Sequence, residues 1–356
     1  MNSSRPKSIG PEPGTSKGTS HIGHSPQEQN THPAPLVSII ILSWKSYEVT
    51  RDCLLSLRNL AYPNFEVVLV DNNSADGSVE KLAPEFPEVR LIENKVNLGF
   101  PGGNNVAISE VLERGTDYLL LLNNDTVVTP DFLAKIVAVA ESDDAIGITT
   151  PKIMYFEPRD RIWFAGGFYK PWWSFPKMRG VNRRDVGRFD QTQEISFATG
   201  CVLLIKAAVV RQIGLLDEAF FLGFEDMDWS LRALRAGYKL VYVGGAVVWH
   251  RASYATKKSA GKDLKDYYSA RNSILFARKH MANRYWPLFV LSLARYLAYR
   301  TGGYLLRLEF NRVAALYRGI WDGFNFRTNR PQTGGAALSR GHTIPETSGR
   351  PDVGES

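Results

Sequence analysis

The sequence predicts an α/β fold in which helices cover a mostly parallel sheet. Its strand-like runs are continuously apolar, as in residues 37–42, which is typical of strands buried on both faces. These runs alternate along the chain with helix-like segments, the arrangement that places helices over a parallel sheet. Polar residues follow several of the strands. Because ligands bind beyond the carboxyl ends of such strands, these positions are candidates for a site.

The expected elements follow in order along the chain. Strands are predicted at 37–42, 66–70, 89–92 and 118–122, and helices at 47–59, 78–85 and 103–114. The alternation weakens after Thr149, and residues 162–188, rich in aromatics, Pro, Gly and Arg, are interpreted as a loop or lid. Regular signals return as an apolar segment at 197–205, helices at 207–213 and 226–236, and strands at 239–243 and 246–249.

Length and composition predict one large domain with appendages. The 356 residues are 44% hydrophobic, enough for a full core. Residues 1–35 and 327–356 are poor in large apolar side chains, so we expect disordered tails. The first of these lacks the apolar core of a signal peptide, which favours a cytoplasmic protein. The two cysteines indicate buried thiols, not a disulfide framework.

Charge favours an anionic partner. The net charge is +7, and the basic excess lies after about residue 177. The basic residues follow no recognised nucleic-acid-binding module, so nucleic acid is not an expected partner.

Asp125 follows four consecutive leucines, so its carboxylate is expected at the mouth of a buried strand. A charge there needs a counter-charge, and Mg²⁺ or Mn²⁺ bound between this carboxylate and phosphate oxygens would provide one. The alternative is that Asn123, Asn124 and Asp125 only form a turn.

Other polar positions are candidates for binding a nucleotide. Asp71 and Asn73 follow the second strand, where their oxygens can accept hydrogen bonds from a base or ribose, although Asp71 can also serve a turn. The Gly-rich segment 97–105 opens a helix, so its backbone N–H groups can approach a ligand. The expected donor-binding residues are Ser43, Asp71, Asn73, Asn97, Gly99, Asn104, Asn123 and Asn124.

The densest acidic cluster, Glu225, Asp226 and Asp228, lies at the predicted start of a helix. Acids there stabilise the helix dipole, but three of them among aromatic residues exceed that need. A partly buried carboxylate of this cluster can serve as a general base. His250 ends an apolar strand, and it is either structural or a metal ligand at the same edge as Asp125.

Taken in order, these segments resemble the family 2 glycosyltransferases of the GT-A fold, which is Rossmann-like, and among them the bacterial rhamnosyltransferase-like branch. The resemblance covers residues 36–280. It is carried by residues 37–41, 70–74, 97–105, 123–125, 198–200 and 224–228. The family's metal motif is Asp-x-Asp, and here Asn123 replaces its first position while Asp125 keeps the last.

The resemblance implies an inverting transfer in which Asp226 is the catalytic base and Asp125 and His250 bind the metal. It also implies acceptor contacts from Thr199 and Gly200, and from Arg271, whose guanidinium can meet phosphate. Glu225, Trp172 and Trp173 are further candidate acceptor-binding residues, on their residue types and positions. The favoured donor is dTDP-rhamnose, with a UDP-sugar as the alternative. The expected acceptor is a polyprenyl diphosphate-linked sugar or a polysaccharide of the cell envelope.

Two segments raise the question of a membrane. Trp172 and Trp173 lie among several arginines, a pairing that suits a lipid diphosphate but also a solvated basic loop. Residues 281–326 mix apolar residues with arginines and contain no span able to cross a bilayer. We expect an amphipathic helical extension that lies on the inner face of the cell membrane, with a helical cap or a homodimer interface as alternatives.

Two other kinds of function stay open. A sugar nucleotidyltransferase would need a Gly-rich phosphate loop after the first strand, and residues 42–46 contain no glycine. A non-catalytic GT-A protein that binds nucleotide or lipid would not depend on the Asp226 carboxylate.

Overall fold

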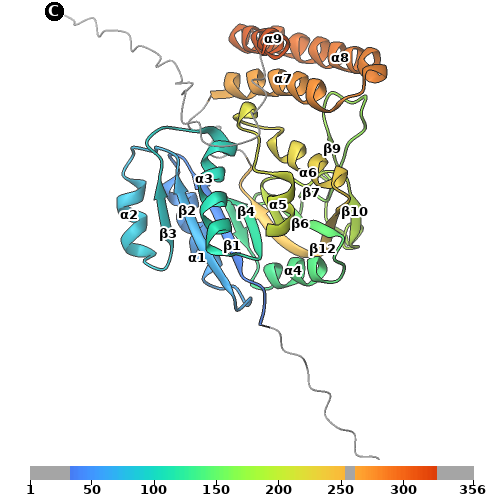
Figure 1. The fold of residues 1–356 in the computed structure, drawn as a ribbon. Coiled ribbons are helices and arrows are strands. Elements are labelled where there is room, and N and C mark those ends of the chain that lie inside the picture. Colours follow the sequence, from blue (N-terminus) through green and yellow to red (C-terminus); the bar gives the residue numbers. More distant parts are fainter. Residues whose placement is uncertain (1–32, 253–260, 327–356) are drawn as a thin grey trace, which may run out of the picture. The chain divides into compact units, whose positions relative to one another are not determined.

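The computed structural model describes residues 33–252 and 261–326 (Figure 1). Apart from residues 33–35, the two predicted tails lie outside the described residues. The described residues from Pro35 onward form one compact unit.

The first half of the sheet is parallel. It comprises β1 (Val37–Ser43), β2 (Phe65–Asp71), β3 (Arg90–Glu93) and β4 (Tyr118–Asn123), in the order β4-β1-β2-β3. The inner strands of this half are almost wholly buried, which explains their unbroken apolar runs. All four strands were predicted within a residue or two.

The second half is mixed. The strand β11 (Val202–Lys206) runs antiparallel between β4 and β6 (Ile146–Tyr155), and β12 (Lys239–His250) is parallel to β6. Shorter antiparallel additions are β5 (Thr126–Val128), β7 (Ile162–Phe164) and β10 (Gln193–Ile195). The predicted α/β fold with a mostly parallel, helix-covered sheet is confirmed.

Several details differ from the prediction. The two strands expected between 239 and 249 are one strand, β12, with a register shift between Val243 and Val247. The strand β6 was not predicted, although nine of its ten residues are buried. The predicted loop at 162–188 contains β7 and the small two-stranded sheet of β8 (Gly167–Phe168) and β9 (Lys177–Met178).

Helices cover the sheet (Figure 1). They are α1 (Tyr47–Leu57), α2 (Ser78–Glu85), α3 (Gly99–Arg114), α4 (Phe132–Glu141), α5 (Ala207–Ile213) and α6 (Glu225–Arg235). The helix α3 packs on β1 and β2, and α4 packs on β6 and β12. Phe132, Ile136 and Ala140 of α4 are buried at a spacing of four, as expected for a helix with one face on a sheet.

Three further helices, α7 (Gly261–His280), α8 (Trp286–Leu305) and α9 (Phe310–Asn325), lie together in Figure 1. The helix α9 packs closely along α7 because Gly319 and Gly323 face the α7 backbone. A Cβ at Gly323 would lie 2.8 Å from the carbonyl oxygen of Arg271, so a side chain there would separate the helices. Within the described residues, we find no helix with the length and apolar content needed to cross a bilayer.

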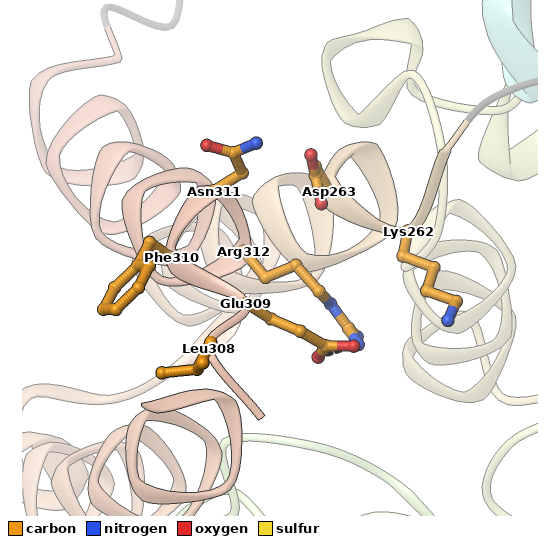
Figure 2. A pocket seen from close by; sticks show the side chains of 7 residues that line it. All are labelled: Lys262, Asp263, Leu308, Glu309, Phe310, Asn311 and Arg312. Atoms are coloured by element: carbon orange, nitrogen blue, oxygen red, sulfur yellow. Dashed lines mark hydrogen bonds and ion pairs between the residues drawn. The ribbon is translucent and has the colours of Figure 1, made fainter. Parts of the chain in front are cut away.

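A buried carboxylate also ties these helices together. Asp266 of α7 accepts hydrogen bonds from the Tyr304 hydroxyl (2.7 Å), from Arg312 Nε (2.7 Å) and from Arg300. A shallow hollow of about 420 Å³ opens beside them, and Figure 2 shows Leu308 and Phe310 on one side of it and Lys262 on the other.

Candidate active site

The strand register brings the predicted nucleotide-binding residues to one edge of the sheet. On β1, Ser43 pairs with Asp71 of β2, and Leu42 pairs with Asn123 of β4. Neighbouring strands lie about 4.8 Å apart, so the two polar strand ends flank β1 within roughly 10 Å. The arrangement follows directly from the parallel pairing of β4, β1 and β2.

Asp71 lies in a hollow of about 140 Å³ beyond β2. Its carboxylate accepts hydrogen bonds from the backbone N–H (3.0 Å) and the hydroxyl of Ser74, which fixes its orientation. Asn73 is exposed at the rim of the same hollow, with a left-handed φ of 62°. Several acceptor groups therefore surround a space beside the strand edge.

The Gly-rich loop is organised by Asn72, a residue that the sequence analysis did not single out. Its Nδ2 donates to Asn97 Oδ1 (2.9 Å) and to the Gly99 carbonyl (3.1 Å), and its Oδ1 accepts from the Leu98 N–H (3.1 Å). Gly99 has a φ of 73°, and a Cβ there would lie 2.5 Å from the Phe221 carbonyl oxygen. Only glycine fits this position.

Other predicted donor-binding residues hold the backbone. Asn104 Nδ2 donates to the Phe100 carbonyl (2.8 Å) within the first turn of α3. Asn124 is buried, and its Nδ2 donates to Ser46 Oγ (2.6 Å) and Thr50 Oγ1 (2.8 Å) at the start of α1. Ser43 belongs to the same buried hydroxyl cluster. Asn123 is only half-buried and accessible at the edge.

The predicted metal ligands, Asp125 and His250, lie in contact. The antiparallel pairing of β5 with β12 places His250 opposite Thr126, so its Nε2 lies 3.0 Å from Asp125 Oδ1. Both side chains are buried. Two adjacent ligands at 2.1 Å from an octahedral ion are separated by about 3 Å, so this spacing suits a shared Mg²⁺ or Mn²⁺.

Further observations concern whether Asp125 and His250 could hold a metal ion. His250 Nδ1 is buried without a hydrogen-bond partner, and the ring of Trp163 packs edge-on against the imidazole at 4.6 Å. The part of the chain that the structure describes contains no group of three or more His, Cys, Asp or Glu side chains suited to a metal. A cation held by Asp125 and His250 would therefore take its remaining ligands from substrate oxygens and water.

Asp226, the predicted base, lies close to this edge. Its Oδ2 accepts a hydrogen bond from the Gly200 N–H (2.9 Å), and its Oδ1 accepts from the Met227 N–H (2.8 Å). The next residue after Gly200, Cys201, accepts from the Asn123 N–H through its carbonyl (2.8 Å). The turn 199–201 thus joins Asp226 to the end of β4.

Burial raises the pKa of Asp226, although hydrogen bonds from the Gly200 and Met227 N–H groups oppose this effect. The pKa of the Cys201 thiol reports on the same region. Burial is the main cause that raises this pKa, and the charges of Asp125 and Asp226 raise it further. Both carboxylates therefore lie within electrostatic range of one thiol.

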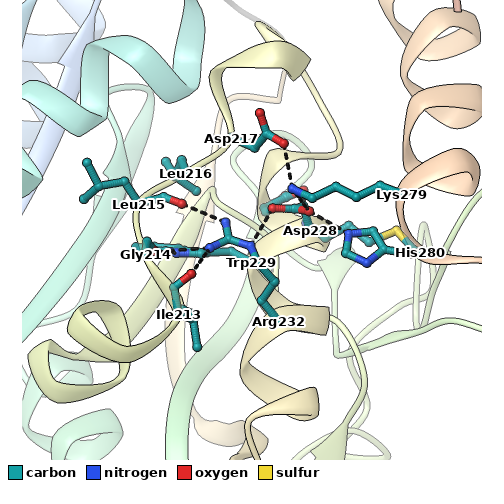
Figure 3. A network of polar contacts seen from close by, with 12 residues as sticks. Ile213, Gly214, Leu215, Leu216, Asp217, Asp228, Trp229, Arg232, Lys279 and His280 are labelled. Carbon is teal, nitrogen blue, oxygen red and sulfur yellow. Dashed lines mark hydrogen bonds and ion pairs between the residues drawn. The ribbon is translucent and has the colours of Figure 1, made fainter. Parts of the chain in front are cut away.

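The two other acids of α6 have different surroundings. Glu225 is buried, its Oε2 has no hydrogen-bond partner, and burial together with the charge of Asp226 raises its pKa well above the usual range. Asp228 is fully buried beside two cations and a histidine. Figure 3 shows its bonds to Arg232 Nε (2.8 Å), Lys279 Nζ (2.7 Å) and His280 Nε2 (2.6 Å).

These three partners decide whether the Asp228 carboxylate is ionised. Burial alone would raise the pKa of Asp228, but the His280 hydrogen bond and the charges of Arg232 and Lys279 outweigh it and lower the pKa to about 2. Asp228 is therefore a structural anion that ties α6 to the end of α7.

The predicted acceptor residues fall into three places. Thr199 and Gly200 lie at the turn that bonds to Asp226, and Glu225 lies next to Asp226 at the start of α6. Trp172 and Trp173 are half-buried in the loop between β8 and β9, where Lys170 lies over both rings and Trp172 contacts Tyr285. Arg271 is buried on α7, and its Nη2 donates to the Ala219 carbonyl (2.8 Å). Its guanidinium is thus bonded to the loop that precedes α6.

Comparison with known proteins gives a consistent picture. Residues 38–214 match the family model described as glycosyl transferase family 2. The chain is 24% identical over 235 residues to the N-acetylglucosaminyl-diphospho-decaprenol L-rhamnosyltransferase of Mycobacterium tuberculosis, covering 60% of this chain and 75% of that protein. It is 24% identical over 232 residues to the dTDP-rhamnosyl transferase RfbF of Shigella flexneri, covering 63% and 74%.

Solved structures agree on the fold. TarS residues 1–349 of S. aureus, in complex with UDP-GlcNAc, give a TM-score of 0.55 at 15% identity, covering 81% of this chain and 80% of that one. The mannosyltransferase PcManGT of Pyrobaculum calidifontis, in complex with GDP-Man and Mn²⁺, gives 0.50 at 16% identity, covering 82% and 88%. The matched family segment ends at residue 214, before Asp226 and His250.

Proposed function

Because the chain belongs to glycosyl transferase family 2, we propose that it transfers a sugar from a nucleoside diphosphate donor to an acceptor hydroxyl, with inversion at the anomeric carbon. The observation that supports this most is the meeting of three acids at one edge of the sheet. Asp71 ends β2, Asp125 follows β4, and Asp226 is joined to the end of β4 through the turn 199–201.

Asp226 has the properties that a base for this reaction needs. Its raised pKa makes the carboxylate a better proton acceptor than an exposed aspartate, while the two backbone N–H groups keep it oriented. In the proposed step, the acceptor oxygen attacks the anomeric carbon and its proton passes to Asp226. The bond from that carbon to the diphosphate oxygen breaks in the same step, so a second catalytic carboxylate is not needed.

The other two acids serve the donor. Asp71 and the hollow around it would take the nucleoside, because their oxygens can accept hydrogen bonds from a base or ribose. Asp125 and His250 would hold Mg²⁺ or Mn²⁺ beside the diphosphate. A bound divalent ion supplies charge stabilisation to a departing diphosphate.

We further propose dTDP-rhamnose as the donor, with a UDP-sugar as the alternative, and a polyprenyl diphosphate-linked sugar or a polysaccharide of the cell envelope as the acceptor. The support is the names of the two relatives, one of which acts on a diphospho-decaprenol carrier. Trp172 and Trp173, with Lys170 and Lys177 over their rings, add an apolar and cationic surface suited to such an acceptor.

A lipid-linked acceptor requires access to a membrane, and we propose that α8 and α9 lie on the inner face of the cell membrane. Leu306 and Leu308 in the turn between these helices are 89% and 73% exposed, and Trp321 of α9 is 70% exposed. Arg295, Arg307 and Arg318 are also exposed on this part of the chain. Apolar side chains beside cations suit the headgroup region of anionic lipids.

Vesicle binding tests the membrane proposal. The protein should sediment with vesicles of anionic phospholipid, and Leu306→Ser with Leu308→Ser should weaken this binding. Val181→Ser, at another exposed apolar residue, is the matched control and should not. Equal binding to neutral and anionic vesicles, or self-association through the same surface without lipid binding, would contradict the proposal and favour the homodimer alternative.

A donor panel tests the proposed reaction. Purified protein is incubated with dTDP-rhamnose or UDP-sugars, Mg²⁺ or Mn²⁺, and a polyprenyl diphosphate sugar, and nucleoside diphosphate release is monitored with and without chelator. We expect release with one donor, abolished by the chelator. An absence of metal-dependent release with every donor would refute the proposed function.

A further inference from the structure

We infer that Arg271 and Asn272 of α7 are positioning residues that hold the loop 219–224 in place and thereby set the position of Asp226. This inference rests on the proposed transferase function and extends it to two residues on a helix outside the sheet. Because their side chains bond to the loop backbone, we assign them no direct contact with substrate.

The hydrogen bonds of Asn272 carry most of the inference. Asn272 is fully buried, and its Nδ2 donates to the carbonyls of Phe220 (2.7 Å), Leu222 (3.0 Å) and Gly223 (2.8 Å). An amide nitrogen has two hydrogens, so three carbonyls share them. One side chain thus holds most of the backbone that precedes α6.

Arg271 completes the contact. Its Nη1 donates to Asn272 Oδ1 (3.0 Å), which orients the amide, and its Nη2 donates to the Ala219 carbonyl (2.8 Å). No ion pair joins Arg271 to a carboxylate among the described residues. Burial lowers the pKa of Arg271, which shows that its environment disfavours the charge. A buried guanidinium bonded mainly to carbonyl groups is costly, so the geometry it enforces is the evident benefit.

The loop needs such an external support. Phe221 and Phe224 have φ values of 59° and 78°, a left-handed conformation that residues other than glycine adopt rarely. Backbone in such a conformation persists only when its surroundings hold it. Besides the Asn272 amide, the stacking of Phe221 on Tyr268 of α7, with ring centroids 5.1 Å apart, contributes to this support.

The loop also touches both halves of the candidate site. On the donor side, the Phe221 carbonyl accepts from the Phe100 N–H (2.7 Å) and fills the space that a Cβ on Gly99 would need. On the acceptor side, the loop continues directly into Glu225 and Asp226. A shift of the loop would therefore move the Gly-rich loop and the base relative to each other.

The first experiment compares turnover with fold stability. The variants are Asn272→Ala, Arg271→Met and Arg271→Lys, where lysine can still reach the Ala219 carbonyl. Asp266→Asn is the matched control, because it removes a buried anion from the same helix without touching the loop. We expect kcat to fall at least tenfold in Asn272→Ala and Arg271→Met, with little change in the Kd of the nucleoside diphosphate. In Arg271→Lys, we expect a smaller fall in kcat than in Arg271→Met.

The pH profile adds a readout that a purely structural role would not change. Release of the loop should weaken the bond from Gly200 to Asp226, so the acidic limb of kcat should move to higher pH in Asn272→Ala. Asp266→Asn, assayed below its melting temperature, should keep both kcat and this limb. Equal losses of kcat in Asn272→Ala and Asp266→Asn at matched stability would overturn the inference.

Hydrogen exchange tests the inference without activity. In Asn272→Ala, or in Arg271→Met if the first variant does not fold, the peptide that contains Phe100 should exchange faster, although it lies far from α7 in sequence. It should be unchanged in Asp266→Asn. If the unaltered protein transfers no sugar, the proposed function fails, whereas unchanged exchange at Phe100 in the loop variants refutes the positioning role alone.

Discussion

The two sides of the first turn of α6 carry the same kind of side chain in opposite surroundings. Asp226 receives hydrogen bonds from the N–H groups of Gly200 and Met227, and its pKa is raised by burial. Asp228 is more deeply buried, yet the His280 hydrogen bond and the charges of Arg232 and Lys279 hold its pKa at about 2. Burial alone therefore does not decide whether a carboxylate can exchange protons, because its partners decide the sign of the shift.

In the proposed function, this difference separates a reactive acid from a structural one within a single turn of α6. Asp226 lies at the edge of the sheet with Asp125, whereas Asp228 faces α7. If the comparison is correct, substitutions of the two residues should affect different quantities. Substitution of Asp226 should change turnover, and substitution of Asp228 should change stability.

The largest effect is expected for Asp226→Asn. Loss of the general base should lower kcat by about 10²- to 10⁴-fold, because the amide cannot accept the acceptor proton. The Kd of the nucleoside diphosphate, measured by calorimetry, should stay within about twofold. Substantial turnover in this variant would show that Asp226 is not the base and would contradict the assignment of different roles to Asp226 and Asp228.

A second effect concerns Asp125, which extends the comparison to the strand edge. Asp125→Asn should raise the concentration of Mn²⁺ needed for half-maximal activity by at least about 10- to 100-fold, because a charged ligand is lost. Titration of activity with Mn²⁺ measures this change. Asp131→Asn, an exposed acid outside the site, is the control. An unchanged metal requirement in Asp125→Asn would remove this residue from the metal site.

The pH dependence of turnover tests whether the pKa of Asp226 is raised. Because the Asp226 carboxylate must be ionised to accept a proton, kcat should fall about tenfold per pH unit below its pKa. That pKa is raised from 3.8, so the limb should lie at higher pH than for an exposed aspartate. A pH profile of kcat measures it. An acidic limb at or below the ordinary value would contradict the raised pKa of Asp226.

The smallest effect on turnover is expected for Asp228→Asn, which should act on stability. The fall of the Asp228 pKa from 3.8 to about 2 corresponds to about 2 kcal/mol of unfolding free energy. Because the folded-state pKa is lowered, this stabilisation is present above pH 4 and is lost as the pH falls toward 2. Urea unfolding at pH 7 should show the difference between the unaltered protein and the variant.

The same measurement at low pH provides the check. Near pH 2 most of the difference should be gone, because the Asp228 carboxylate of the unaltered protein is then almost fully protonated in the unfolded state and about half protonated in the folded state. A deficit that persists unchanged at pH 2 would assign the loss to packing instead of charge.

The sequence predicted the first half of the sheet well because each strand there is a short apolar run that ends in a polar residue. The strand-end positions of Asp71 and Asp125 follow from that local pattern, whereas the order β4-β1-β2-β3 was not predicted and is known only from the structure. It missed β6, in which Thr149, Thr150 and Lys152 are buried. The Lys152 ammonium is paired with Asp185 and Asp190, and only tertiary contacts reveal that such polar residues belong inside.

The candidate site could also be predicted only in part from the sequence. Residue type and position were enough to single out Asp226, but not to predict that Asn124 would bond to the start of α1 or that Asn72 would organise the Gly-rich loop. These partners lie 25 to 78 residues away in sequence. Arg271 was expected to meet phosphate. Its bond to the Ala219 carbonyl could not be predicted from the sequence, because that bond depends on how α7 packs.

The contact between Asp125 and His250 also has a consequence for how the protein acquires activity. His250 ends β12, and the next residue, Arg251, bonds through Nη2 to Asp52 of α1 (2.6 Å), 199 residues away in sequence. Contacts of such high sequence separation are slow to form, because the intervening chain must be ordered first. During synthesis, the hollow beside Asp71, whose lining residues lie between positions 71 and 94, can thus form well before Asp125 and His250 come into contact.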